Sequence, residues 1–227
     1  MQPILLLHGA IGGSVQVQPL ADALSGHYDV HLFSFPGHGG TPMPEEPFSI
    51  SAFAAYTLKY IEENKLNNII VFGYSMGGYV ALYLARQYPQ LFARIVTLGT
   101  KFHWDEPTAA KEVKMLNADA IAAKVPAFAK ALEQLHAPNN WKEVLQQTAA
   151  MLTGMGKDNP LKPEDYPQIT TPVLVMLGDR DNMVTLDETV QVYKQLPNAQ
   201  MAMLPGTPHP VEKVDVELVV CFIQRGK

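Results

Sequence analysis

Residues 67–89 read NNIIVFGYSMGGYVALYLARQYP, and this stretch decides the fold. Its first half is an apolar run typical of a buried strand, and it leads directly into Gly73. From Gly77 onward, apolar residues return every three or four positions, which indicates a helix. Ser75 lies between the two glycines. The stretch therefore predicts a sharp turn from a strand into a helix, with a serine hydroxyl presented at the turn.

The rest of the chain repeats this alternation of strands and helices. Six short apolar runs bounded by glycine or proline predict strands at residues 4–7, 30–33, 69–73, 94–99, 173–178 and 200–205. Helical patterns between them cover residues 49–64, 77–88 and 186–196. Such an alternation predicts a parallel α/β sheet with helices on both faces. Ligands of these sheets usually bind at the carboxyl ends of the strands.

One segment interrupts the alternation. Residues 101–168 contain helix-like stretches at 106–116, 118–135 and 140–152, and they contain no convincing strand. We therefore expect a core formed by residues 1–100 and 169–227, with residues 101–168 as a helical insertion. The insertion is interpreted either as a cap over the catalytic edge of the sheet or as an ordinary helical subdomain packed on its side.

Composition narrows the class of protein. The chain of 227 residues has 17 basic and 22 acidic residues, a net charge of −5 and no long run of either sign, which argues against nucleic acid as a partner. The single cysteine, Cys221, excludes an internal disulfide and agrees with a reducing compartment. The apolar run at residues 4–7 is too short for a signal core or a membrane span. We expect a soluble, cytoplasmic protein, and its oligomeric state stays open.

A serine in this setting suggests nucleophilic chemistry. A serine hydroxyl is a poor nucleophile at neutral pH, so it needs a neighbouring base and a geometry that presents its oxygen. In a tight strand-to-helix turn, side chains two residues before and after the serine would collide with their surroundings, which explains Gly73 and Gly77. The Met76 N–H, the first amide of the helix, would point at a carbonyl under attack and stabilise its developing negative charge.

Five motifs together resemble the α/β-hydrolase superfamily. In chain order they are HGAIGG (8–13), FPGHGGTP (35–42), GYSMGG (73–78), GDRDNMV (178–184) and PGTPHPVE (205–212). The likeness runs from residue 4 to the C-terminus, and the insertion falls where such enzymes have their cap. Most relatives place two antiparallel strands before the His-Gly strand, which here starts at residue 4. We therefore predict six parallel strands in the order 2-1-3-4-5-6.

The resemblance also implies a catalytic triad. Relatives follow the chain order serine, acid, histidine, and the histidine that fits is His209, with Pro208 where the family more often has glycine. The sequence around the acid leaves Asp179 and Asp181 open. The family pattern G-x-x-D-x-x-V favours Asp181, and Asp179 is then interpreted as a turn or capping residue.

The first loop is expected to complete the site. By the resemblance, the second oxyanion donor is the backbone N–H of Ala10, with Ile11 as the alternative. His8 is interpreted as bracing this loop by hydrogen bonds, because no companion ligands stand at metal-binding spacing. By the resemblance, His38 belongs to a turn motif of the family and is not catalytic. The glycines of HGAIGG lack the lysine of a phosphate-binding loop. We expect neither a metal nor a cofactor.

These observations favour a serine hydrolase of carboxylesterase type that acts on a small-molecule ester or thioester. Serine at the turn argues against relatives that use aspartate there, namely dehalogenases and epoxide hydrolases. Lys101 or Arg180 is a candidate to hold a charged substrate. The residues expected to line an apolar pocket, unless they only pack in the core, are Phe102, Trp104, Met115, Trp141, Met151 and Met155.

Three alternatives stay open at this point. The first is another reaction on the same scaffold, such as carbon-carbon bond hydrolysis, a lyase or aminopeptidase reaction, or a cofactor-free peroxidase activity. The second is a ligand-binding receptor with very slow turnover. The third is a structural or partner-binding protein with a vestigial site.

Overall fold

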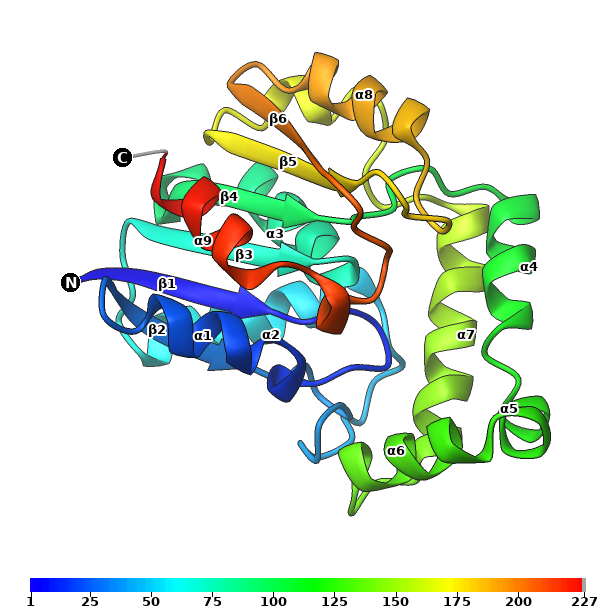
Figure 1. The fold of residues 1–227 in the computed structure, drawn as a ribbon. Helices are drawn as coiled ribbons and strands as arrows, with labels where there is room; N and C mark the ends of the chain where they lie inside the picture. The colour runs from blue at the N-terminus through cyan, green and yellow to red at the C-terminus, as the bar shows by residue number, and fades with distance from the viewer. Residues whose placement is uncertain (226–227) are drawn as a thin grey trace.

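A six-stranded, all-parallel sheet forms the centre of the computed structural model, which describes residues 1–225 (Figure 1). Its strands are β1 (Gln2–Leu7), β2 (Tyr28–Phe33), β3 (Ile69–Tyr74), β4 (Phe92–Leu98), β5 (Val173–Gly178) and β6 (Ala199–Leu204). They lie in the order β2-β1-β3-β4-β5-β6. The predicted number, orientation and order of the strands are confirmed.

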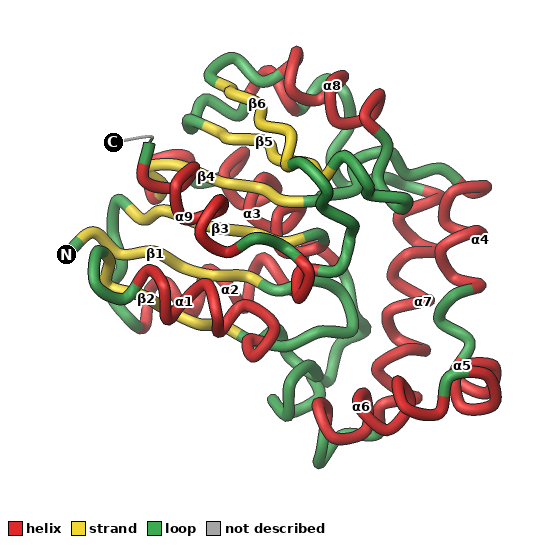
Figure 2. The backbone as a smooth tube through the Cα atoms, in the orientation of Figure 1, coloured by secondary structure: helices red, strands yellow, loops and turns green. Residues whose placement is uncertain are grey.

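Helices cover both faces of this sheet, as predicted (Figure 2). One face carries α1 (Gln18–Leu24) and α9 (Val216–Gln224), which were not predicted. The other carries α2 (Ile50–Glu63), α3 (Met76–Gln87) and α8 (Leu186–Gln195). Side chains of a strand point alternately to the two faces, so continuously apolar strands fill two separate cores. In β1, Leu5 and Leu7 pack toward α2 and α3, whereas Ile4 and Leu6 pack toward α1 and α9.

Four helices connect β4 to β5 and form the insertion region (Figure 1). They are α4 (Glu106–Lys114), α5 (Ala118–Lys124), α6 (Pro126–His136) and α7 (Trp141–Lys157). The prediction of one helix over 118–135 is wrong, because the chain leaves helical geometry at Val125 and α6 begins at Pro126. Proline lacks the N–H for an intrahelical bond and disfavours helical backbone in the residue before it. The helix expected to end at residue 152 continues to Lys157.

The insertion contacts the core again where α6 turns into α7. Asn139 Nδ2 donates hydrogen bonds to the carbonyl oxygens of Thr41 and Gly37, at 2.6 and 3.2 Å. The buried His136 accepts a hydrogen bond at Nδ1 from Gly39 N–H (3.2 Å), and its Nε2 lies 3.1 Å from the Ile11 carbonyl oxygen. These contacts hold the far end of the insertion against two core loops, at the carboxyl edge of the strands.

Candidate active site

Ser75 lies between β3 and α3 in a strained backbone conformation. Its φ of 50° and ψ of −116° fall in a region that side-chain-bearing residues rarely adopt, and such strain persists only where the surroundings enforce it. The Ser75 N–H donates to the Leu98 carbonyl oxygen at 2.8 Å, and Thr100 Oγ1 donates to the Ser75 carbonyl oxygen at 3.0 Å. The neighbouring strand β4 and its following loop therefore fix the turn.

The two glycines of the motif have a steric reason. A Cβ added to Gly73 would lie 2.4 Å from the backbone nitrogen of Gly78. A Cβ added to Gly77 would lie 2.6 Å from the carbonyl oxygen of Leu7 in β1. Both obstacles are backbone atoms, which cannot rotate away. The turn can hold Ser75 in this position only because neither neighbour has a side chain.

His209 and Asp181 form a hydrogen-bonded pair at the ends of β5 and β6. His209 Nδ1 lies 2.7 Å from Asp181 Oδ2, and the two side chains are 9% and 2% exposed. The other carboxylate oxygen, Oδ1, accepts hydrogen bonds from the N–H groups of Met183 (2.8 Å) and Val184 (2.9 Å). Burial alone would raise the pKa of Asp181. The hydrogen bonds from His209 and the two amides outweigh burial and lower this pKa, so the carboxylate stays ionised.

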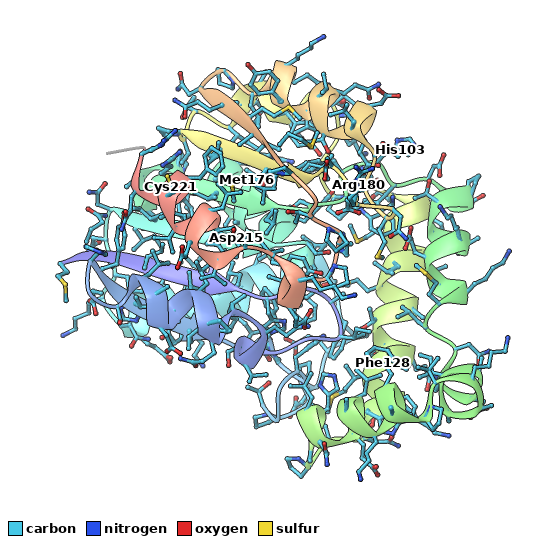
Figure 3. The ribbon with its side chains drawn as sticks, in the orientation of Figure 1. His103, Phe128, Met176, Arg180, Asp215 and Cys221 are labelled. Atoms are coloured by element: carbon cyan, nitrogen blue, oxygen red, sulfur yellow. The ribbon has the colours of Figure 1, made fainter. Side chains whose placement is uncertain are left out.

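Asp179, the other candidate acid, has different contacts. Its Oδ1 accepts a hydrogen bond from Thr207 N–H at 3.2 Å, and its Oδ2 lies 3.8 Å from Nε of the exposed Arg180 (Figure 3). Asp179 thus braces the loop before His209, and it is Asp181 that contacts the imidazole.

Tyr74 is a further residue of the site that the sequence reasoning missed. Its hydroxyl donates a hydrogen bond to the His209 carbonyl oxygen at 3.0 Å, across 135 positions of sequence. Burial raises the pKa of this phenol, which keeps the donating proton in place. Tyr74 lies within the G-x-S-x-G motif, at a position where the motif accepts any residue, so no sequence signal marked it.

Two cavities meet beside Ser75. The smaller has a volume of about 80 Å³ and the larger about 780 Å³. The residues that line both are Ala10, Ser75, Glu112, Leu152, Met183 and His209. Ser75 and His209 therefore share the walls of the same space, between the carboxyl edge of the sheet and the insertion.

Four of the six residues expected in the pocket lie on these walls: Trp104, Met151 and Met155 in the smaller cavity, and Met115 in the larger one. Phe102 and Trp141 are outside both walls. Phe102 is 3% exposed and packs against Tyr166, and Trp141 is 9% exposed and packs inside the insertion with Leu145. Phe102 thus packs in the main core and Trp141 in the interior of the insertion, and neither lines the two cavities.

The mouth of the larger cavity is apolar. Phe128 of α6 lies on its wall and is 43% exposed (Figure 3). Met115 and Val15 line the same cavity and are also exposed. Exposed large apolar side chains around a cleft favour apolar ligands.

The two expected oxyanion donors both border the site. Met76 is the first residue of α3, and Ala10 follows β1 in the HGAIGG loop. In the part of the chain that the structure describes, neither backbone N–H donates a hydrogen bond to a protein acceptor. Both amides are thus available to a bound oxygen atom. Ile11, the alternative donor, has a φ of 52° and contacts His136 through its carbonyl.

His8 and His38 are fully buried behind this loop. His8 Nε2 accepts a hydrogen bond from Phe35 N–H (3.1 Å), and His8 Nδ1 lies 2.7 Å from the Gly9 carbonyl oxygen. His38 Nδ1 lies 3.0 Å from the Pro36 carbonyl oxygen. Burial lowers the pKa of His8 to about 4 and that of His38 to about 3. Both rings are therefore neutral: His8 links the two core loops through Phe35, and His38 hydrogen-bonds within its own loop and packs against the His8 ring.

Residues 2–129 match the family described as alpha/beta hydrolase fold. The chain belongs to that family and is an α/β hydrolase. It is 24% identical over 237 residues to a 2-(acetamidomethylene)succinate hydrolase of Mesorhizobium japonicum, covering 96% of this chain and 84% of that protein. It is 23% identical over 235 residues to a pimeloyl-[acyl-carrier protein] methyl ester esterase of Vibrio parahaemolyticus, covering 91% and 86%.

The fold is also similar to that of a thermophilic esterase from Thermogutta terrifontis, solved with malate bound. The TM-score is 0.80 at 21% sequence identity, and the match covers 100% of this chain and 89% of the esterase. Within residues 1–225, no helix is both long and apolar enough to cross a membrane. The same residues contain no group of three or more His, Cys, Asp or Glu side chains placed to hold a metal ion.

Proposed function

We propose that this protein is a serine hydrolase that cleaves a small carboxylic ester or thioester through an acyl-enzyme on Ser75. The observation that supports this most strongly is the buried His209–Asp181 pair, 2.7 Å apart, whose imidazole lies on the wall of the cavities that Ser75 also lines. Serine at a strained turn, an imidazole beside it and an ionised carboxylate behind the imidazole are the parts that acyl transfer requires.

In the proposed mechanism, Ser75 Oγ attacks the carbonyl carbon while His209 Nε2 takes the serine proton. Asp181 holds His209 with Nδ1 protonated, so that Nε2 is the free base, and stabilises the imidazolium that forms. The N–H groups of Met76 and Ala10 donate to the oxyanion of the tetrahedral intermediate, and each such donor contributes about a hundred- to a thousandfold in rate.

The acyl-enzyme forms in one step and is hydrolysed in a second, and each step passes through a tetrahedral intermediate. The intermediate collapses, the bond to the alcohol or thiol breaks, and His209 gives its proton to that leaving group. Water next attacks the acyl carbon and loses a proton to His209. A second tetrahedral intermediate releases the carboxylic acid and returns the proton to Ser75 Oγ.

The test is hydrolysis of p-nitrophenyl esters of increasing acyl-chain length, together with mass spectrometry after treatment with an organophosphonate. We expect turnover in the wild type, a label on Ser75, and loss of both in Ser75→Ala. The matched control is Ser25→Ala, which removes an exposed serine hydroxyl on the helix-end turn of α1. Full esterase activity in Ser75→Ala would refute the proposal, and a labelled serine with negligible turnover would favour a receptor or another reaction.

A further inference from the structure

Glu112 is an acidic residue of the insertion that lines the cavities beside Ser75. It belongs to α4 and lines both cavities that contain Ser75 and His209. Among the described residues common to the two cavities, it is the one carboxylate. The glutamate is 4% exposed, so bulk water does not solvate it freely.

Lys101 is the residue that pairs with Glu112, but it does not form a hydrogen bond with the glutamate. Glu112 Oε1 lies 3.7 Å from Lys101 Nζ, which is longer than a hydrogen bond. The Lys101 ammonium instead donates to the Met183 carbonyl oxygen at 2.8 Å and lies 3.7 Å from Glu188 Oε2. Lys101 was a candidate to hold a charged substrate, but two glutamates already surround it.

Glu188, the second glutamate beside Lys101, has a structural role. Glu188 Oε1 accepts hydrogen bonds from the N–H groups of Phe102 (3.0 Å) and His103 (3.4 Å). Its Oε2 accepts from the N–H and the hydroxyl of Thr185, at 3.1 and 3.0 Å. Glu112, by contrast, accepts no hydrogen bond from any residue between 1 and 225.

Carboxylate oxygens that accept no hydrogen bond from the protein, beside a largely apolar cavity, can accept one from a donor group on a ligand. Two carboxylates around one ammonium leave one formal negative charge beside the cavity. Leu152, Met151 and Trp104 make most of the nearby wall apolar. In an apolar pocket, a single polar group of this kind fixes the orientation of the ligand.

The sizes of the two cavities indicate which part of a substrate Glu112 meets. In the proposed reaction the leaving group departs first, whereas the acyl group stays on Ser75 until water arrives. The larger opening of about 780 Å³ suits the departing group, and the smaller cavity of about 80 Å³ suits a short acyl group. Glu112 lines both cavities, but Lys101 lines only the smaller one, so the Glu112–Lys101 pair faces the space of the acyl group.

We propose that Glu112 is a specificity-determining residue that accepts a hydrogen bond from a hydroxyl or ammonium group on a short acyl chain of the substrate. This inference rests on the proposed function. The ammonium gives the larger effect because it also neutralises the excess negative charge. A carboxylate at the same position is disfavoured, because Glu112 and Glu188 outnumber Lys101.

The test compares four p-nitrophenyl esters: butyrate, 3-hydroxybutyrate, 4-aminobutyrate and hemisuccinate. In the wild type we expect kcat/KM for the hydroxy and amino esters to exceed that for butyrate by tenfold or more, mainly through KM. In Glu112→Gln the ratio of amino ester to butyrate falls to near one. Glu106→Gln, an exposed glutamate on the same helix, is the matched control and keeps the wild-type ratio.

Equal ratios in the wild type and Glu112→Gln would overturn the inference, as would a preference for the hemisuccinate. A binding measurement separates this failure from failure of the proposed function. Ser75→Ala protein is titrated with 4-aminobutyramide and with butyramide, and we expect at least tenfold tighter binding of the first, lost in the Ser75→Ala, Glu112→Gln double variant. If the protein hydrolyses the butyrate ester but binds the two amides equally well, the proposed hydrolase function is retained and the role of Glu112 is refuted.

Discussion

At the scale of single residues, backbone contacts of the turn between β3 and α3 hold Ser75 in its position. Gly73 and Gly77 approach backbone atoms of the adjoining helix and strand too closely for any side chain. Hydrogen bonds position His209: Asp181 bonds to its ring, and the Tyr74 hydroxyl donates to its carbonyl oxygen. Each contact joins residues that are far apart in the sequence.

Replacing Gly77 by alanine should damage both stability and the site. The new Cβ would lie 2.6 Å from a carbonyl oxygen of β1, so the turn must move, and overpacking of this kind costs about 1–3 kcal/mol. Urea denaturation measures the loss, and the organophosphonate labelling rate of Ser75 should fall with it. Gly154→Ala is the control. Its Cβ meets nothing within 4 Å in the last turn of α7, so we expect stabilisation by up to about 0.5–1 kcal/mol. Equal effects of the two substitutions would contradict this steric explanation.

A second prediction compares the same substitution at the two aspartates after β5, Asp179 and Asp181. Asp181→Asn replaces the ionised oxygen that contacts His209 Nδ1 and favours the wrong imidazole tautomer, so we expect kcat to fall by about 10³–10⁴-fold. Asp179→Asn keeps an oxygen that can accept from Thr207 N–H and removes only the charge near the exposed Arg180, so it should cost less than about tenfold. Steady-state kinetics with a p-nitrophenyl ester measures both. A larger loss in Asp179→Asn would reverse the assignment of the acid.

At the scale of elements, the insertion and the core are joined by the turn between α6 and α7. His136 bonds to Gly39 and Ile11, and Asn139 bonds to Gly37 and Thr41. Because Ile11 follows Ala10, the position of α6 is linked to the loop that presents an expected oxyanion donor. Helix α6 of the insertion thereby helps to position the HGAIGG loop of the core.

His136→Ala should loosen this junction. It leaves the part-buried Gly39 N–H and Ile11 carbonyl without their partner, and the loss of each hydrogen bond costs about 1 kcal/mol. We expect faster amide hydrogen exchange in residues 9–13 and 37–41, and a lower kcat/KM. The control Gln134→Ala removes an exposed side chain from the same helix and should change neither. Unchanged exchange in both loops of His136→Ala would show that the junction does not depend on this imidazole.

For the whole molecule, the three buried histidines make stability depend on pH. Burial lowers the pKa of His8 to about 4, that of His38 to about 3, and that of His136, each from an ordinary value of 6.5. Below about pH 6.5 the unfolded chain takes up protons that the folded protein does not bind. Stability is therefore complete above this pH and is lost as the pH falls toward the folded-state pKa values.

We expect each of these histidines to add a slope of up to about 1.4 kcal/mol per pH unit to the free energy of unfolding. Urea denaturation at several values between pH 7.5 and 5 measures this slope, above the range where most carboxylates titrate. His136→Gln should reduce the slope, because one fewer buried imidazole is present. A free energy of unfolding that stays constant from pH 7.5 to 5 would contradict the prediction.

Much of the fold followed from local patterns. Short apolar runs marked all six strands, most continuously in the inner strands β1, β3, β4 and β5, which are buried on both faces, whereas the edge strands β2 and β6 are partly exposed. The helices α1 and α9 were not predicted: α1 is short, with Pro19 at its start, and α9 is also short and largely apolar. The break before α6 was missed because apolar spacing continued through Pro126.

The sequence by itself determined the parallel sheet and the turn at Ser75, because both depend on residues adjacent in the chain: apolar runs, and glycines on either side of one serine. Only the tertiary structure decided that His209 pairs with Asp181 rather than Asp179, and that Glu112 and Tyr74 reach the site while Phe102 and Trp141 do not. The physical reason is that these contacts join residues on different strands and on the insertion. Their distances depend on how those elements pack, which no local pattern encodes.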